Sequence, residues 1–317
     1  MNFKFIFFLL LSISMYSCTS SDSDSKDSST CEITSYQYLM AFHSCDEEVF
    51  DDCSDPSYHK IYLAGSDDGD TWLPIKDFKG VSGSVPDIVF FNDYLYIFHT
   101  ASFMWEKVDK CFDIVDSGDV ELTSEEDSTL VDPSLIVNGD SLEMFYLPGV
   151  EGSDPARCES YPCTKEIHSA YSDEEDVASF IQISGNRASL TLDAGAFSDP
   201  DIIELSDGSF LLYVSRGQNT YVYSSDKLSE AFELESESAS DGSGGVPSAI
   251  TISSDEVWLY VTTNNEGTQI IQKATSSDGI EFGDFSQVLD YSILKDVSEL
   301  TDVASPSIID WPGSSWK

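Results

Sequence analysis

The sequence predicts an all-β fold, a five-bladed β-propeller whose ring is closed by one shared blade. A hairpin-like segment recurs five times, alternating apolar residues prevail over helical periodicity, and the two ends of the chain each hold part of one repeat. The recurring segments are VPDIVFFNDYLYIFHT (85–100), DPSLIVNGDSLEMFYLP (132–148), DPDIIELSDGSFLLYVSR (199–216), VPSAITISSDEVWLYVTT (246–263) and SPSIIDWPGSSW (305–316).

Each repeat has a proline near its start. The prolines are 47, 67, 47 and 59 residues apart, and they are Pro86, Pro133, Pro200, Pro247 and Pro306. Such a step has room for about four short strands with their turns. Each repeat is therefore predicted to form one four-stranded sheet.

The ends of the chain complement each other. The fifth segment stops after one strand, whereas the segments 36–44, 59–69 and 72–78 read as strands that lack a first one. We predict that SPSIIDW (305–311) supplies the inner strand of a blade whose other strands come from residues 35–79. Closure of this kind removes free sheet edges.

One turn has a recognisable chemistry. The run SDDGDTW (66–72) resembles the Asp-box hairpin found in sialidases and other propellers, and SSDG (276–279) is a partial copy. In such a hairpin the Ser and Asp side chains bond the turn backbone and the aromatic residue packs between blades. We expect a structural role for these residues.

The N-terminal region predicts export. Lys4, the apolar run 5–13 and Cys18 match a bacterial lipoprotein signal over residues 1–17, with acylation at Cys18; simple cleavage by the general signal peptidase is the alternative. Residues 18–34 are polar and acidic and are expected to form a disordered tether to a body at 35–317. The predicted location is the bacterial cell envelope, lipid-anchored at the outer membrane or cell surface, with the body in the periplasm or outside the cell.

Composition narrows the partners. The formal net charge is −43, which argues against nucleic acid and anionic lipid as partners and favours a monomer. The predicted disulfides are Cys45–Cys53 and Cys158–Cys163, which close short loops, with Cys31–Cys111 as the remaining pair. The sequence has no pair of Cys-x-x-Cys motifs, so we do not expect a zinc site.

The D-P motifs carry the functional information. LVDPSL (130–135) and SDPDI (198–202) place Asp132 and Asp199 before repeat prolines, whereas Asp87 follows Pro86. A five-bladed ring with such motifs resembles the propellers of glycoside hydrolase family 43, the arabinanases and xylosidases, over most of residues 35–317.

That resemblance implies that one Asp before a proline acts as the general base and that a second such Asp, in the next blade, orients the general acid and adjusts its pKa. It also implies a Glu one blade later as the general acid. Asp132, Asp199 and Asp87 are the catalytic candidates. The position of the Glu is Gly245 here, so the resemblance implies a degenerate catalytic set. Inverting hydrolysis needs both an acid and a base, and two coupled Asp residues can share these roles. The alternative for each Asp is a turn or strand-start cap.

Further side chains are expected near the same centre. We predict substrate contacts from Asp201, Arg216, His99, His43 and Trp105, with Trp105 exposed in a long segment, 101–119. Arg216 in an ion pair with Asp199 or Asp201, and His residues satisfied in the interior, are the alternatives. No cofactor is expected; calcium is the one metal that the abundance of oxygen ligands favours.

Three functions compete. The first is a cell-envelope glycoside hydrolase, and the second is a non-catalytic propeller that binds a glycan or a protein. A sialidase-like enzyme is disfavoured because it needs an arginine triad, and the chain has only Arg157, Arg187 and Arg216.

Overall fold

The structure is a computed structural model that describes residues 36–45, 53, 55–100, 103–124, 129–149, 154–172, 176–265, 267–295 and 302–313. The compact body comprises residues 32–317. The predicted signal (1–17) and tether (18–34), with Cys18 and Cys31, lie outside the described residues. Among the helices of the described part, none has the length and apolar character needed to cross a membrane.

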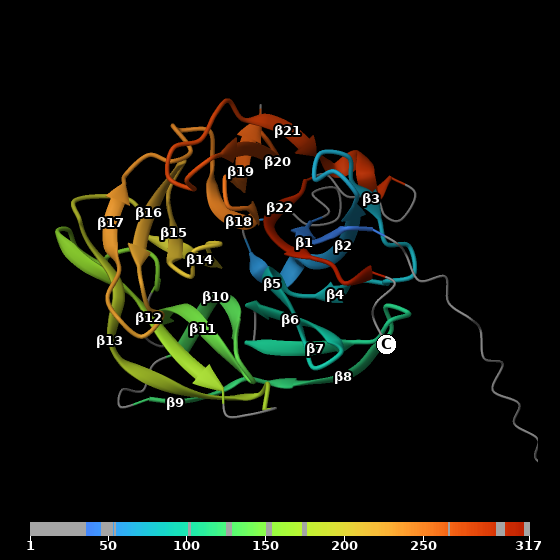
Figure 1. The fold of residues 1–317 in the computed structure, drawn as a ribbon, viewed down its shortest axis with the longest axis horizontal. Coiled ribbons are helices and arrows are strands. Elements are labelled where there is room, and N and C mark those ends of the chain that lie inside the picture. Colours follow the sequence, from blue (N-terminus) through green and yellow to red (C-terminus); the bar gives the residue numbers. More distant parts are fainter. Residues whose placement is uncertain are drawn as a thin grey trace, which may run out of the picture. The chain divides into compact units, whose positions relative to one another are not determined.

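Five antiparallel sheets form the body, one for each repeat, which confirms the predicted five-bladed β-propeller (Figure 1). We number the blades I to V along the chain. Blade I contains β5 (Ser84–Phe91), β6 (Tyr94–Thr100), β7 (Met104–Val108) and β8 (Ile114–Asp119). Blade II contains β10 (Thr129–Asn138), β11 (Ser141–Gly149), β12 (Cys163–Ser172) and β13 (Ser179–Leu192), to which β9 (Glu121–Thr123) adds in parallel.

The other blades follow the same plan. Blade III contains β14 (Ser198–Glu204), β15 (Phe210–Arg216), β16 (Asn219–Ser225) and β17 (Glu233–Ser236). Blade IV contains β18 (Gly245–Ser253), β19 (Glu256–Asn265), β20 (Thr268–Ser276) and β21 (Ser286–Leu289). Blade V contains β22 (Ala304–Asp310), β1 (Tyr38–Ser44), β2 (Lys60–Ser66), β3 (Leu73–Pro74) and β4 (Val81–Ser82). Short 3-10 helices occupy Pro56–Tyr58 and Tyr291–Leu294.

Blade V joins the two ends of the chain, as the repeats predicted. β22 pairs antiparallel with β1, with Tyr38 opposite Asp310 and Ala41 opposite Ser307. The inner strands then follow one another round a closed circuit, β22 against β5, β5 against β10, β10 against β14, β14 against β18, and β18 against β22 (Figure 1).

Five hydrophobic clusters fill the spaces between successive blades. Between blades IV and V, for example, Trp258 and Ile250 pack against Tyr38 and Met40. Alternation along each strand puts such residues on the two faces of a sheet, and each face is covered by the next blade. Because every blade has two neighbours, both faces are apolar.

A ring of hydrogen bonds links the five inner strands. In each blade the residue after the repeat proline accepts, through its side chain, the backbone N–H of the equivalent strand in the next blade. The bonds are Leu135 N to Asp87 Oδ2 (2.7 Å), Ile202 N to Ser134 Oγ (3.0 Å), Ala249 N to Asp201 Oδ2 (2.8 Å), Ile308 N to Ser248 Oγ (3.1 Å) and Ile88 N to Ser307 Oγ (2.9 Å). We call this closed circuit the buried ring, because the five accepting residues are all buried.

A second set of links lies one residue before each proline. The N–H of this residue donates to a side chain near the end of the second strand of the preceding blade. The donor and acceptor pairs are Val85 to His43 Nδ1, Asp132 to Thr100 Oγ1, Val246 to Ser215 Oγ and Ser305 to Thr262 Oγ1. At the remaining step the equivalent side chain is Leu147, which has no acceptor, and the Asp199 N–H bonds the Asp132 carboxyl group. We call this set the rim ring.

Both rings depend on one backbone device. The residue before each repeat proline is left-handed, with φ between 46° and 52°, at Val85, Asp132, Asp199, Val246 and Ser305. Such a conformation is strained for non-glycine residues, and for Val above all. The pairing register shifts at these points in all five blades, as in a β-bulge. The repeated strain is therefore architectural, since it turns each inner strand toward its neighbour.

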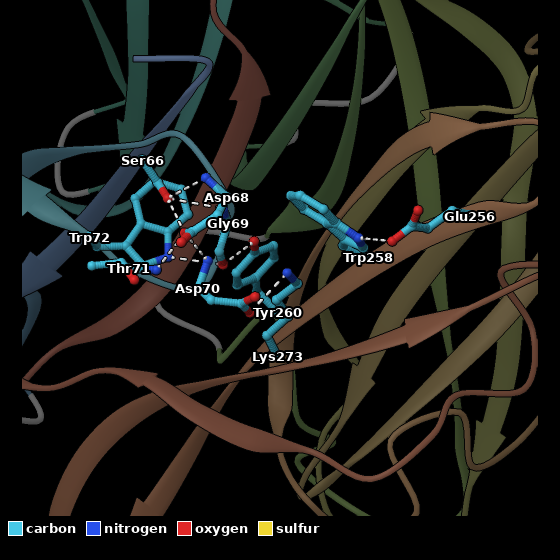
Figure 2. A network of polar contacts seen from close by, with 10 residues as sticks. All are labelled: Ser66, Asp68, Gly69, Asp70, Thr71, Trp72, Glu256, Trp258, Tyr260 and Lys273. Carbon is cyan, nitrogen blue, oxygen red and sulfur yellow. Dashed lines mark hydrogen bonds and ion pairs between the residues drawn. The ribbon is translucent and has the colours of Figure 1, made fainter.

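The Asp-box prediction is confirmed at residues 66–72 (Figure 2). Ser66 Oγ accepts the Gly69 N–H, and Asp68 Oδ1 accepts the N–H groups of Asp70 and Thr71. The Gly69 carbonyl receives the Trp72 indole N–H at 3.2 Å and the Tyr260 hydroxyl of blade IV at 2.8 Å.

The partial copy repeats this contact. Tyr213 of blade III donates its hydroxyl to the Gly279 carbonyl at 2.7 Å, and Ser276 and Asp278 bond the turn in the same way. The hairpin thus fastens one blade to the preceding one.

Two of the predicted disulfides are present, Cys45–Cys53 and Cys158–Cys163. Cys111 is also disulfide-bonded; its predicted partner Cys31 lies outside the described residues, so that pairing stays a prediction. The expectation of a long loop at 101–119 was wrong, because β7 and β8 form the outer half of blade I there.

Ser307→Ala tests the buried ring at the blade that closes the propeller. The variant leaves the buried Ile88 N–H without its acceptor and removes the Ser307 Oγ to Asp87 Oδ1 bond of 2.8 Å. We expect the free energy of unfolding to fall by about 1–3 kcal/mol, measured by urea denaturation. Ser117→Ala, on the exposed outer strand β8, is the matched control and should be near neutral. Equal stability of the two variants would contradict a stabilising role for the ring.

Candidate functional site

The structure brings the four predicted aspartates together at the axis of the body. One small cavity is lined by the residues that flank the repeat prolines: Val85, Pro86, Asp87, Asp132, Pro133, Asp199, Pro200, Asp201, Val246, Pro247, Ser305 and Pro306. Since each of these residues opens an inner strand, the convergence follows directly from the fivefold repeat.

The cavity itself is too small for a sugar. Its volume is about 20 Å³, close to what one water molecule occupies. A saccharide therefore contacts this site only from outside, through residues that keep some surface exposure. That condition divides the aspartates into two pairs.

Asp87 and Asp201 form the inaccessible pair. They are 6% and 7% exposed, and a carboxyl oxygen of each accepts a backbone N–H in the buried ring. Asp87 was predicted to be catalytic and Asp201 to bind substrate. Their position after the proline gives both a structural task instead, which is the alternative that the sequence left open.

The buried pair titrates abnormally. Burial raises the pKa of Asp87 to about 7, although hydrogen bonds from Ser307, Leu135 and Ile88 act in the opposite direction. Burial, with the neighbouring Asp87 as a second cause, raises the pKa of Asp201 well above its usual range. Both groups therefore keep their proton to a higher pH than an ordinary Asp does.

Asp132 and Asp199 form the accessible pair. Both residues are partly exposed, sit on adjacent inner strands, and have left-handed backbones with φ of 51° and 50°. Their carboxyl groups nevertheless lie among protein atoms at the opening of the axial cavity, which we call the mouth. Burial there removes water from the carboxyl groups and is the main cause that raises the pKa of each. The negative charge of Asp199 raises the pKa of Asp132 further.

The two groups differ in their surroundings. Ser198 Oγ donates to Asp199 Oδ2 at 2.6 Å, which lowers the pKa of Asp199 against the effect of burial. Asp132 has the Asp199 N–H as a donor but faces Asp154 as well as Asp199, and its pKa rises well above the usual range. The proton of the pair therefore favours Asp132, and the charge favours Asp199.

The structure explains the glycine at position 245. A Cβ on Gly245 would lie 2.1 Å from the Gly217 carbonyl oxygen and 2.6 Å from Ser215 Oγ. No side chain fits there without movement of the β15–β16 turn. A carboxylate at this position is therefore excluded by the backbone of blade III.

Several other candidates belong to the architecture. His43, Ser215 and Thr262 are acceptors of the rim ring. In blade I this task falls to Thr100, while the neighbouring His99 is buried and lies against Gly83. The second-strand ends thus connect blades, because each faces the strained residue of the next inner strand.

Arg216 holds a loop at the mouth. Its guanidinium donates to the carbonyl oxygens of Ala196 (3.1 Å) and Ala194 (2.7 Å), and no ion pair with Asp199 or Asp201 occurs among the described residues. Tyr161, inside the Cys158–Cys163 loop, donates to the Gly195 carbonyl from the other side at 2.5 Å. Both contacts fix the segment that leads into Asp199.

The prediction of an exposed Trp105 was wrong. Trp105 is 9% exposed and packs on Tyr96 and Gly118. It lies on β7 opposite Phe98, and its ring enters the cluster between blades I and II. The strands within residues 101–119 were not recognised from the sequence. Because Trp105 lies on one of them, its side chain points inward rather than into a loop.

The arrangement of possible metal ligands does not indicate a metal site. The described residues contain no group of three or more His, Cys, Asp or Glu side chains placed to hold a metal ion. Calcium stays a prediction.

Sequence reasoning missed two contributors, Ser198 and Asp154. Ser198 immediately precedes a D-P motif, so its proximity to Asp199 was readable. Asp154 acts on Asp132 from the loop that the Cys158–Cys163 disulfide shortens, and only the three-dimensional path of that loop reveals it.

The pH dependence of stability tests the buried pair. Because the folded-state pKa of Asp87 is about 7 and its ordinary value is 3.8, its contribution to stability is present at low pH and is lost as the pH rises through 7. We expect the free energy of unfolding to be higher at pH 5 than at pH 8 by on the order of 2 kcal/mol. Asp87→Asn, a mimic of the neutral form, should flatten this profile, and the exposed Asp207→Asn should not. A wild-type protein that is more stable at pH 8 would refute the assignment.

No family model matches the sequence, and a search of curated proteins finds no match. Solved structures of similar fold include an arabinanase of Bacillus subtilis, with 14% identity, a TM-score of 0.47, and 64% of this chain and 78% of that chain covered. A family 43 β-1,3-galactosidase has 11% identity and a TM-score of 0.46 over 66% and 76% of the two chains. A β-xylosidase has 15% identity and a TM-score of 0.40, with 51% of this chain and only 59% of that chain covered. At these values the likeness concerns the fold alone: the protein is a five-bladed β-propeller whose solved neighbours are glycoside hydrolases.

Proposed function

We propose that the protein is a glycoside hydrolase whose acid and base are Asp132 and Asp199. The observation that carries this proposal is the accessible pair itself, two neighbouring carboxyl groups at the axial cavity, each with a raised pKa. Pairs of carboxyl groups held in different protonation states are what glycosidic bond cleavage requires.

The roles follow from the surroundings of each group. Asp132, with the higher pKa, acts as the acid and gives its proton to the glycosidic oxygen as the bond to the anomeric carbon breaks. Asp199, held toward the charged form by Ser198, removes a proton from a water molecule whose oxygen attacks the anomeric carbon. One proton leaves the protein and one returns, so the pair ends with its charge unchanged but its proton transferred.

The absence of a third carboxyl group is consistent with this division. Position 245 cannot hold a side chain, so the pair cannot rely on a carboxylate from blade IV at that point. Asp87 and Asp201 are occupied in the buried ring. Asp132 and Asp199 are the aspartates lining this cavity that remain partly exposed.

The substrate class follows from charge. With a formal net charge of −43, the protein repels polyanions. We therefore propose a neutral poly- or oligosaccharide that approaches the mouth beside the loop held by Arg216 and Tyr161. We also propose attachment of the body to the bacterial cell envelope through acylated Cys18, which the signal-like N-terminus supports.

A propeller that only binds glycans is the second candidate. The cavity of about 20 Å³ favours it, because no saccharide ring is enclosed by the described residues at the axis. Exclusion of water by an enclosed site usually aids catalysis. Activity measurements separate the two functions.

Release of reducing ends from neutral arabinan, xylan, galactan and agarose oligosaccharides tests the proposal. We expect one of these substrates to be cleaved, and Asp132→Asn and Asp199→Asn each to lower kcat by at least about 100-fold, the usual scale for a general acid or base. Asp207→Asn, at the opposite end of the same inner hairpin as Asp199, is the control and should retain activity. Binding without cleavage across the panel would assign the non-catalytic function instead.

A further inference from the structure

A second and much larger cavity lies on the flank of the body. It has a volume of about 720 Å³ and opens between the outer strands of blades IV and V. Its walls come from residues 72–77, around β3, and from residues 287–293, around β21 and the second 3-10 helix. None of its lining residues belongs to the axial cavity.

The size of this flank cavity is that of a ligand site. Small-molecule sites in proteins have volumes of about 300–1,000 Å³. The axial cavity, in contrast, has room for about one water molecule. Unlike the axial cavity, the flank cavity therefore has room for several saccharide units at once.

The lining of the flank cavity combines apolar and polar residues, and several of the apolar ones are held in place. Trp72 is buried, held by the indole hydrogen bond to Gly69 and by an edge contact with Tyr260 at 6.0 Å (Figure 2). Ile75 and Leu289 are buried beside it. Tyr36 also lines the cavity and lies directly on Gly65, where no Cβ fits beneath its ring. These contacts hold the walls in place without a ligand.

The rim of the flank cavity is polar and partly ordered in advance. Gln287 Nε2 donates to Asp290 Oδ2 at 2.8 Å, and Asp290 Oδ1 accepts the Ser292 N–H at 2.9 Å. An amide and a carboxylate fixed in this way present both donors and acceptors. Asp77, Lys76 and the Ser292 hydroxyl add further polar groups to the lining.

Charge decides which class of ligand fits. Lys76 is the single cation of the lining, which also includes two carboxylates, those of Asp77 and Asp290. On a protein of net charge −43, a phosphate, nucleotide or acidic glycan would be repelled. The exposed Leu73 and the partly exposed ring of Tyr36 suit the C–H faces of a sugar, and the paired amide and carboxylate groups suit its hydroxyls.

From these observations we propose that the flank cavity binds a neutral oligosaccharide, separately from the axial site. Such a site retains a polymer on the body while the accessible pair acts on it, and it binds whether or not the pair is catalytic. The proposal goes beyond hydrolysis and stands on the volume, walls and charge of this cavity.

Calorimetric titration with xylohexaose, arabinohexaose and galactohexaose tests it. Binding is measured in the Asp199→Asn variant, so that cleavage does not consume the probe. We expect at least one hexasaccharide to bind and Leu73→Ser to weaken it about tenfold, a loss of about 1.4 kcal/mol. Leu234→Ser is the matched control, because both leucines lie exposed on an outer strand, at 52% and 43%.

Gln287→Ala provides a second variant at an exposed position, which spares the fold. It should also weaken binding, while Leu234→Ser leaves the affinity unchanged. The proposal is overturned if none of the three hexasaccharides binds, or if both flank variants bind as tightly as the control. If the wild-type protein binds a hexasaccharide but does not hydrolyse it, the proposed activity is refuted and the proposed flank site stands.

Discussion

The constraint on which this structure depends is the unpaired edge of each inner strand. A sheet edge carries backbone N–H groups that water normally satisfies, but five edges meeting at an axis exclude water. The protein answers with the buried ring, in which a Ser or Asp after each repeat proline accepts the N–H of the next blade. The bulge with its left-handed residue brings donor and acceptor together. The same device closes the circuit at blade V, where the last strand of the chain meets the first.

This constraint also determines what the central acids do. An Asp one residue after the proline is an architectural acceptor, as at Asp87, whereas an Asp one residue before it faces the mouth, as at Asp132. The difference is a single position in the sequence. It divides four Asp residues of the same chemistry into a structural pair, Asp87 and Asp201, and an accessible pair, Asp132 and Asp199. The chemistry that we propose belongs to the accessible pair because its carboxyl groups take no part in the buried ring and both residues keep some surface exposure.

Much of the fold was predictable because the same segment recurs five times in the sequence. The proline spacing predicted the number of blades, the partial fifth repeat predicted the closure, and the Asp-box predicted the bonds of Ser66 and Asp68 to the turn backbone. The convergence of Asp132 and Asp199 followed from the same register. In these cases a local pattern determines the three-dimensional neighbour.

The failures have a common physical origin in contacts between blades. Trp105 was predicted to be exposed because strand pairing at residues 101–119 was not recognised. His43 was predicted to contact substrate, but its ring accepts the N–H of Val85, the strained residue of the next blade. The flank cavity joins residues 72–77 to 287–293, two segments without any shared motif, so no reading of either alone would reveal it.

Amide hydrogen exchange followed by NMR tests the buried ring most directly. The N–H groups of Ile88, Leu135, Ile202, Ala249 and Ile308 point away from their own sheets toward the neighbouring blade. If the ring bonds them, they exchange as slowly as amides inside the sheets, through global unfolding. Exchange at the rate of solvent-exposed edge amides would contradict the account of how the blades are joined and of why Asp87 and Asp201 are unavailable for chemistry.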